Sequence, residues 1–255
     1  MDKQKIIFRD LGLLDYQLAW DYQEQLLQEN VGKKSLVYRL ESGVKENEPA
    51  AADPDHQTQH YLLFTEHPPV YTLGKSGNEK NILLDDAGLL EKKIQFFNTN
   101  RGGDITFHGP GQIVGYPILD LEKFYTDIGR YLRNLEEVII LTLAEYGIKG
   151  DRSPGETGVW IDPGVAGRER KICAIGVRCS RWITMHGFAF NVNTDLSYFN
   201  HIIPCGIVNK QVTSLEKELG HGLNAGEVKE KVKKNFEQVF EAVLTRVADQ
   251  KSFSK

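Results

Sequence analysis

The chain has 255 residues, of which 40% are hydrophobic and 26% charged, and its formal net charge is −4. This composition is typical of a globular protein, and the negative charge argues against a general nucleic-acid-binding protein. The three cysteines show no zinc-type spacing and indicate no disulfide framework. No apolar run is long enough for a signal peptide or a membrane span, so we expect a cytoplasmic protein with no membrane association.

The N-terminal half is predicted to hold one helix and several short strands. The helix begins at Asp15, has apolar residues every three to four positions, and ends at Gly32. Residues 41–60 lack periodicity and are rich in Glu, Pro and Asp, which predicts an exposed loop. Strands are expected at 6–14, 35–40, 61–65, 70–73, 94–98, 105–107 and 112–119. Gly115 and Pro117 suggest that the last of these strands lies at a sheet edge or contains a bulge.

The C-terminal half is predicted to hold two amphipathic helices. Thr126 or Asp127 caps the first helix, and Gly147 ends it. Asn224 caps the second, whose apolar stripe continues through Val243, so that 221–255 form a helical extension. Strands are expected at 157–161, 172–178 and 184–192. Because helices and strands do not alternate strictly, we predict one α+β domain over the whole chain, with a mixed or antiparallel sheet flanked by helices.

The first candidate feature is the twelve-residue stretch from Arg101 to Gln112. It holds four glycines, a proline, an aspartate and a histidine. The adjacent Gly102 and Gly103 would let main-chain N–H groups face a ligand, and the segment after His108 must turn. The stretch fits either a wall of a ligand site or a tight hairpin whose histidine only caps a turn.

A second candidate feature is Cys205, which lies between a proline and a glycine, where a turn could expose its sulfur. A thiolate is the reactive form of cysteine, and it needs a nearby cation or base to form at neutral pH. Lys171, His186, His108 and Arg101 are the candidates. Cys205 could equally be a small buried hydrophobe, Lys171 a strand-edge lysine, and the two histidines structural. A metal site built from His108, His186 and Cys205 has no supporting spacing.

The remaining two cysteines and a cluster of basic residues have simpler explanations. Cys173 and Cys179 alternate with apolar residues in a predicted strand and fit a buried role. The basic residues between 168 and 181 could meet an acidic protein or form a solvated face.

Four motifs together resemble the signature of the octanoyltransferases of lipoate biosynthesis. They are Arg101–Gln112, Lys171–Gly176, His186–Ala189 and Pro204–Gly206, and the similarity runs from about Leu13 to Leu219. The resemblance implies a fold similar to the lipoate and biotin protein ligase catalytic domain. Three features depart from the family: Cys173 replaces a small residue, the 41–60 loop is long, and the C-terminal helix is extended.

The resemblance also implies roles for individual residues. Cys205 would be the acyl-thioester nucleophile, and Lys171 would lower its pKa and shuttle protons. A lysine free in water has a pKa of about 10.4 and is a poor base at neutral pH, so Lys171 would need partial desolvation. The acyl group would bind Arg101, Gly102, Gly103, Asp104, Ile105, Thr106, Phe107, His108, Ala174, Ile175, Gly176, His186, Gly187, Phe188 and Ala189. Phe107, Ile175, Phe188 and Phe190 could form its apolar slot.

The implied donor is octanoyl-acyl carrier protein. The implied acceptors are lysines on lipoyl domains of 2-oxoacid dehydrogenase E2 subunits and on the glycine cleavage H protein. A thioester donor is already activated, so we expect an enzyme that uses no cofactor and no metal. We also expect a monomer. Residues 74–77 lack the full glycine spacing of a phosphate loop. The alternatives are an ATP-dependent lipoate or biotin protein ligase, and a non-catalytic module that binds acyl carrier protein.

Overall fold

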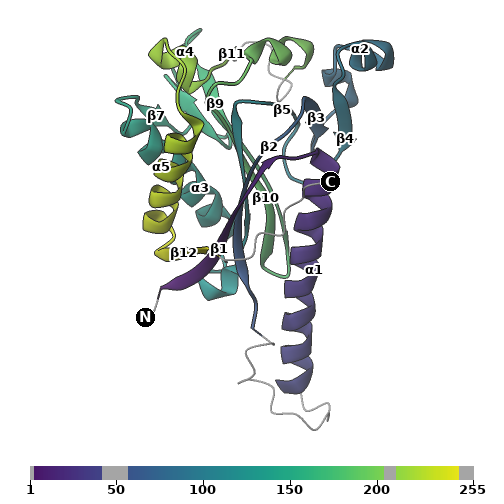
Figure 1. The fold of residues 1–255 in the computed structure, drawn as a ribbon, viewed down its shortest axis with the longest axis vertical. Coiled ribbons are helices and arrows are strands. Elements are labelled where there is room, and N and C mark those ends of the chain that lie inside the picture. Colours follow the sequence, from purple (N-terminus) through teal and green to yellow (C-terminus); the bar gives the residue numbers. More distant parts are fainter. Residues whose placement is uncertain (1–2, 42–56, 204–210, 247–255) are drawn as a thin grey trace.

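A mixed sheet of nine strands forms the centre of the part of the chain that the structure, a computed structural model, describes: residues 3–41, 57–203 and 211–246 (Figure 1). Its order is β12-β1-β2-β6-β10-β9-β8-β7, with β11 paired to β9. The strands are β1 (Gln4–Leu13), β2 (His60–Glu66), β6 (Gln112–Ile118), β7 (Gly150–Asp151), β8 (Val159–Ile161), β9 (Arg170–Ser180), β10 (Ile183–Asn191), β11 (Gln211–Val212) and β12 (Ala242–Arg246). Pairing is parallel among β12, β1 and β2, and antiparallel from β2 to β7.

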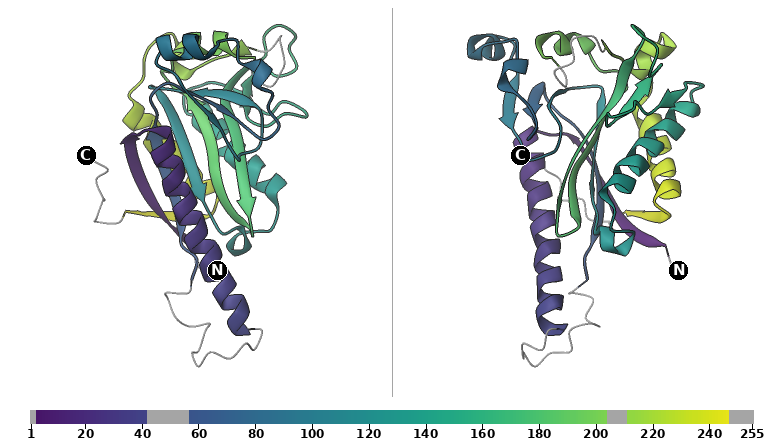
Figure 2. Two further views of the ribbon diagram at one scale, coloured as in Figure 1. Left: turned by 90° about the vertical axis from the view of Figure 1, so that its right-hand side faces the viewer. Right: turned by 180° about the vertical axis from the view of Figure 1, so that it is seen from behind.

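Helices cover both faces of this sheet. Helix α1 (Tyr16–Glu41) lies on one face, and α3 (Ile128–Ala144) and α5 (Ala225–Val239) lie on the other (Figure 2). Asp127 and Asn224 cap α3 and α5 as side-chain acceptors, as the sequence predicts. The fully buried side chains of α3 and α5 share one hydrophobic core with the sheet. These layers confirm the α+β class.

A second, three-stranded sheet stands beside the large one. Its order is β4-β3-β5, with β4 (Gln95–Asn98), β3 (Val70–Leu73) and β5 (Ile105–His108). Short helices α2 (Asp86–Glu91) and α4 (Leu215–Leu219) and three 3-10 turns (Glu79–Asn81, Leu121–Lys123 and Leu196–His201) complete the described elements. The glycine-rich stretch therefore enters the small sheet as β5 and leaves into the large sheet as β6. None of the described helices is long and apolar enough to cross a bilayer.

The N-terminal helix is longer than predicted, and the strand predicted at 35–40 is wrong. Helix α1 runs through Gly32 to Glu41. A glycine inside a helix costs only about 1 kcal/mol relative to alanine. Contacts distant in sequence hold the second half of α1: Lys34 Nζ lies 2.9 Å from Asp120 Oδ1, and Asn30 Nδ2 donates to the Gln59 carbonyl at 2.8 Å. Residues 42–56 of the predicted loop lie outside the described residues.

The predicted C-terminal helical extension is wrong beyond Val239. Glu241 adopts a φ of 49°, which ends the helical path, and β12 follows beside β1. Val243 is exposed while its neighbours Ala242 and Leu244 pack inward, which is the alternation of a strand. The spacing of Val239 and Val243 alone fits a helix equally well, so the sequence pattern did not separate the two. Residues 247–255 lie outside the described residues.

For strand β6 the sequence predicts an edge position or a bulge, and both are wrong: the strand is central and its pairing with β2 and β10 shows no register shift. It lies between β2 and β10. Its pairing with β10 covers only Gln112 to Gly115, where the last pair is Gly115 with Phe188. Pro117 lies beyond this paired part, so its missing N–H costs no hydrogen bond to β10.

Candidate active site

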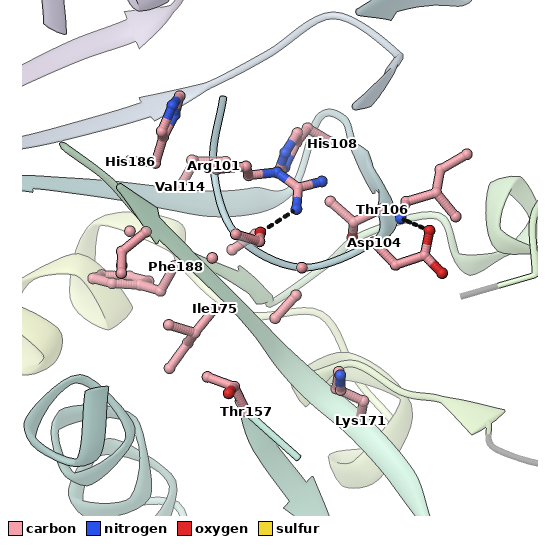
Figure 3. Close-up of a pocket in the computed structure, with 18 of the residues that line it drawn as sticks. Arg101, Asp104, Thr106, His108, Val114, Thr157, Lys171, Ile175, His186 and Phe188 are labelled. Carbon is pink, nitrogen blue, oxygen red and sulfur yellow. Dashed lines mark hydrogen bonds between the residues drawn. The ribbon is translucent and has the colours of Figure 1, made fainter. Parts of the chain in front are cut away.

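A cavity of about 660 Å³ lies where the glycine-rich stretch meets β9 and β10 (Figure 3). Its lining includes Lys171 and all the predicted acyl-binding residues except Phe107: Arg101, Gly102, Gly103, Asp104, Ile105, Thr106, His108, Ala174, Ile175, Gly176, His186, Gly187, Phe188 and Ala189. The structure thus brings three of the four motifs together. Their role in binding substrate stays a prediction.

Two of the four residues predicted for the apolar slot point elsewhere. Phe107 stacks on Tyr198 with ring centroids 4.5 Å apart, in the core of the small sheet. Phe190 is buried in the core that α3 and α5 share with the large sheet. Phe190 lies on the same face of β10 as Phe188, two residues further along the strand, and is not among the lining residues. Ile175 and Phe188 remain as slot residues.

Close packing fixes the 101–104 loop against β9. The Gly102 N–H donates to the Val177 carbonyl at 2.9 Å, so the prediction that this N–H faces a ligand is wrong. A Cβ placed on Gly176 would lie 2.7 Å from the Gly102 carbonyl oxygen, closer than real Cβ contacts allow. The glycine at 176 is therefore a requirement for this approach, because any side chain there would push the loop away from the strand.

The 74–77 turn supports the loop from its other side. Its Lys75 N–H donates to the Arg101 carbonyl at 2.9 Å, and its Ser76 N–H donates to the Gly103 carbonyl at 3.1 Å. The N–H groups of Gly74 and Gly77 donate to the carbonyls of Asp104 and Gly74. All four N–H groups of the turn are used within the protein. This supports the prediction that the turn is not a phosphate loop.

Arg101 and Asp104 hydrogen-bond to different parts of the cavity wall. Arg101 Nη2 donates to Thr72 O at 2.6 Å and to Thr72 Oγ1 at 2.9 Å. Asp104 accepts from the Ile105 N–H at 2.7 Å and from Asn81 Nδ2 at 2.7 Å. The aspartate holds the loop in shape, while the buried guanidinium ties the loop to β3.

His108 is a neutral imidazole whose tautomer follows from its partners. Gln112 Nε2 donates to Phe107 O at 3.1 Å and to Asn191 Oδ1 at 2.9 Å, so its Oε1 is the acceptor. His108 Nδ1, 2.8 Å from that oxygen, therefore carries the proton. Its Nε2 accepts from Thr72 Oγ1 at 3.3 Å. Burial lowers the pKa of His108 well below its ordinary value, with smaller contributions from His67 and Arg101.

His186 is also neutral. Its Nε2 lies 2.7 Å from Asn100 Oδ1, and the Gln23 side chain accepts from its main-chain N–H at 2.9 Å. Burial, with Arg101 nearby, lowers the pKa of His186 to about 3. Because the pKa values of His108 and His186 are lowered, neither histidine is a cation at neutral pH and each is a weak base. The structure leaves Arg101 and Lys171 from the four predicted candidates.

A bulge in β9 turns Lys171 toward the cavity. Val159 of β8 pairs with Cys173, but the next residue, Trp160, pairs with Lys171, so Ile172 is extra. Ile172 and Cys173 both pack into the core on the α3 side, although consecutive strand residues normally face opposite ways. Lys171 consequently shares the face of Trp160, and both line the cavity.

The Lys171 side chain lies in a mostly desolvated place. Its Nζ is 4.6 Å from the centroid of the Trp160 ring and 3.8 Å from Glu156 Oε2. The side chains of Lys171 and Glu156 are only 14% and 15% exposed. The predicted partial desolvation of Lys171 therefore has a structural basis. The sequence carried no signal for Glu156, and Trp160 was visible only as a strand residue.

Cys205 lies in 204–210, outside the described residues, so its pairing with Lys171 stays a prediction. The described chain resumes at Gln211, and Val212 pairs directly with Lys171. Burial raises the pKa of Cys173, which is fully enclosed, and also that of the half-buried Cys179. Neither of these two thiols is suited to act as a nucleophile at neutral pH.

The basic residues between 168 and 181 are largely balanced by carboxylates. Asp162 lies 3.0 Å from Arg168 and 2.7 Å from Arg170, while Arg178 lies 2.7 Å from Glu24. This arrangement fits the solvated face better than a site for an acidic protein.

Comparison with known proteins identifies the class. The family model for the lipoyl protein ligase A/B catalytic domain matches residues 15–237, and the chain belongs to this family. Within it, the chain is 58% identical over 240 residues to the octanoyltransferase of Flavobacterium psychrophilum, covering 94% of this chain and 98% of the relative. It is 55% identical over 242 residues to the octanoyltransferase of Christiangramia forsetii, with the same coverage of 94% and 98%. The resemblance predicted from the four motifs is confirmed.

Solved structures agree on the fold. The bi-partite lipoate protein ligase of Thermoplasma acidophilum superimposes with a TM-score of 0.63 at 16% identity, over 98% of this chain and 89% of that one. The same organism's putative lipoate protein ligase with bound lipoic acid gives 0.63 at 14% identity, over 99% and 91%. At such identities the likeness establishes the lipoate protein ligase fold and nothing about activity.

Proposed function

We propose that this chain is an octanoyltransferase of lipoate biosynthesis, which moves an octanoyl group from acyl carrier protein to a lysine of a lipoyl domain. One observation carries the proposal: in a chain that matches octanoyltransferases almost end to end, the family's motif residues line one cavity with a mostly buried lysine. The acceptors are lipoyl domains of 2-oxoacid dehydrogenase E2 subunits and the glycine cleavage H protein.

The first half-reaction loads the enzyme. The Cys205 thiolate attacks the thioester carbonyl of the donor, and the carrier thiolate leaves with the electron pair of the broken C–S bond. Lys171 accepts the Cys205 proton beforehand and returns it to the leaving sulfur. One thioester replaces another, so the step is close to energetic balance and needs no nucleotide.

The second half-reaction forms the amide. The neutral amine of the acceptor lysine attacks the Cys205 thioester, and the Cys205 thiolate leaves. Lys171 takes the proton from the attacking nitrogen and returns it to the Cys205 sulfur, which restores the starting state. An amide is more stable than a thioester, so this step runs downhill.

The apolar part of the cavity suits a saturated acyl chain. Val114, Ala174, Ile175, Phe188 and Ala189 present hydrocarbon surface there. Burying each methylene contributes about 0.8 kcal/mol, so the six methylenes of an octanoyl group give roughly 5 kcal/mol of binding. Because His108 and His186 are neutral, a bound acyl chain would not have to displace water from a charged imidazole.

Intact-mass analysis after mixing with octanoyl-acyl carrier protein tests the proposal. We expect one octanoyl adduct on the wild type, removable by hydroxylamine and mapped to Cys205. Cys205→Ser should give none. Cys173→Ala is the matched control, because that thiol is buried and its loss should leave loading intact. Loading of the Cys205→Ser variant would show that the wrong thiol was chosen.

A nucleotide requirement separates this function from the two alternatives. The fold is shared with a lipoate-protein ligase A solved with ATP, at a TM-score of 0.64 and 13% identity. Turnover with octanoyl-acyl carrier protein alone supports the transferase. Turnover only with free octanoate and ATP would indicate a ligase, and binding of the carrier without any adduct would indicate a non-catalytic module.

A further inference from the structure

The Lys171 end of the cavity contains a carboxylate that the transfer chemistry does not use. Glu156 Oε2 lies 3.8 Å from Lys171 Nζ, and both side chains are mostly buried. Both residues line the cavity, together with Trp160. An ion pair that is largely removed from water is stronger than a surface pair, because less solvent screens it.

The loop that carries Glu156 is anchored to helix α3. Glu136 of α3 is fully buried, and its Oε1 accepts from the Gly158 N–H at 2.9 Å. Its Oε2 accepts from Arg152 Nε at 3.0 Å. The main-chain N–H of Glu156 donates to the Ser153 carbonyl at 3.1 Å. One carboxylate thus fixes the residues on both sides of Glu156.

The same loop also touches the strand that carries Lys171. Gly158 has a φ of 115°, and a Cβ there would lie 2.5 Å from the Cys173 carbonyl oxygen. Only glycine allows this approach. Because Cys173 belongs to the bulge that orients Lys171, the loop and the lysine are held in one rigid unit.

We propose that Glu156 is a positioning residue for Lys171. It holds the Lys171 ammonium against the Trp160 ring, at the place where the proton is exchanged. No bond to Glu156 forms or breaks. The inference rests on the proposed role of Lys171 in octanoyl transfer, but the Glu156–Lys171 contact can be tested without any octanoyl donor.

The first experiment measures the contact directly. Brief acetylation with acetic anhydride at pH 7.5, followed by peptide mass mapping, reports the reactivity of Lys171, because only the neutral amine reacts. Glu156→Gln removes the charge and keeps the shape, so we expect Lys171 to react several-fold faster. Glu156→Asp should give an intermediate rate. Glu24→Gln is the control, since it breaks the ion pair with Arg178 outside the cavity.

The second experiment measures octanoyl loading of the same variants at varied donor concentration. We expect Glu156→Gln to lower the rate at saturating donor about 10-fold, with the half-saturating concentration unchanged within twofold, and Glu156→Asp to recover part of the rate. Unchanged Lys171 acetylation in Glu156→Gln would overturn the inference, and so would a loss confined to the half-saturating concentration. If the wild type fails to load, the proposed function fails, while the acetylation result still decides the contact.

Discussion

Around Arg101 the cavity is bounded by a network of hydrogen bonds within the protein, whereas around Lys171 it is bounded by an ammonium beside a ring and a carboxylate. In the Arg101 wall, defined as Thr72, Arg101, His108 and Gln112, each of the polar contacts described above joins one protein group to another. The Lys171 end is defined as Glu156, Trp160 and Lys171. There, Lys171 Nζ lies 3.8 Å from Glu156 Oε2 and 4.6 Å from the centroid of the Trp160 ring.

This difference suggests that the Arg101 wall fixes the shape of the cavity, while the Lys171 end carries out proton transfer in the proposed reaction. The histidines that line the cavity are neutral because burial lowers their pKa values, and an arginine does not release its proton in a protein. Among the basic side chains that the structure describes in the lining, this leaves Lys171 for the proton exchange that we propose. In the proposed function, the Arg101 wall would supply a fixed surface for the acyl chain. The predictions below test this division of roles.

Removing the amine of Lys171 should give the largest effect. Lys171→Ala deletes the proposed acid and base, which typically contributes 10²- to 10⁴-fold to a rate, so we expect octanoyl loading to fall about 10³-fold. The measurement is the rate of adduct formation by intact mass, with thermal unfolding to show that the variant is folded.

Lys229→Ala provides the matched control for this prediction. Its side chain is 13% exposed and pairs with Asp10 at 3.0 Å, so it resembles Lys171 in burial and pairing but does not line the cavity. We expect its loading rate to equal that of the wild type. If Lys171→Ala loads within tenfold of the wild type, the division between wall and proton carrier is wrong.

The buried neutral histidines should make the free energy of unfolding fall when the pH is lowered. Burial lowers the pKa of His60 to about 4, of His67 to about 4 and of His186 to about 3. The unfolded chain, with a histidine pKa of about 6.5, binds more protons below that pH. The stabilisation is thus fully present above pH 6.5 and is lost as the pH falls toward 4. Burial also lowers the pKa of His108 well below its ordinary value, so four histidines contribute. From pH 7.5 to 5.5 each should cost about 1.3 kcal/mol, or roughly 5 kcal/mol for the four.

Urea unfolding at the two pH values measures this loss, and His60→Asn isolates one contribution. His60 Nδ1 accepts from the Asp120 N–H at 3.2 Å, and the asparagine side-chain oxygen can accept in the same place without titrating. We expect the pH-dependent loss to shrink by about 1.3 kcal/mol in this variant. An unchanged loss would mean that His60 is already charged in the folded protein.

Local signals in the sequence were sufficient for much of this molecule. Asp127 and Asn224 marked helix starts. The glycines after Arg101 marked a loop of the cavity, although the Gly102 N–H contacts Val177 and does not face a ligand. The C-terminus was misassigned because apolar spacing at Val239 and Val243 fits two structures. Deciding between them requires knowing that β1 has a free edge to pair with, which is a property of the folded sheet.

The Lys171 end shows why part of the site could not be predicted. The direction of Lys171 depends on a register shift between β8 and β9, and no single strand encodes the register of a pair. Glu156 reaches Lys171 because Glu136, twenty residues earlier, fixes its loop. The protonation of His108 depends on where Gln112 places its other hydrogen bonds. Each of these features depends on a contact between segments that meet only in the folded protein.

The last and smallest effect concerns the fit of the Arg101 wall. A Cβ at Gly176 would lie 2.7 Å from the Gly102 carbonyl oxygen and 3.3 Å from Arg101 Cδ and Nη1. Gly176→Ala should therefore displace the loop and reduce stability by about 1–3 kcal/mol, the usual cost of overpacking. We expect loading to fall about 10-fold at the same time, because a cost of roughly 1.4 kcal/mol in placing the acyl chain is a tenfold loss of rate.

Gly32→Ala shows whether that result is specific to the wall. Apart from its chain neighbours and the helix's own backbone, no described atom lies within 4 Å of a Cβ at Gly32, which is inside helix α1. Alanine favours a helix over glycine, so this variant should gain about 0.5–1 kcal/mol and load at the wild-type rate. Urea unfolding and adduct formation on both variants complete the comparison. A Gly176→Ala protein that is as stable and as active as Gly32→Ala would mean that the 101–104 loop can move without cost. The hydrogen bonds of the Arg101 wall would then not define the shape of the cavity.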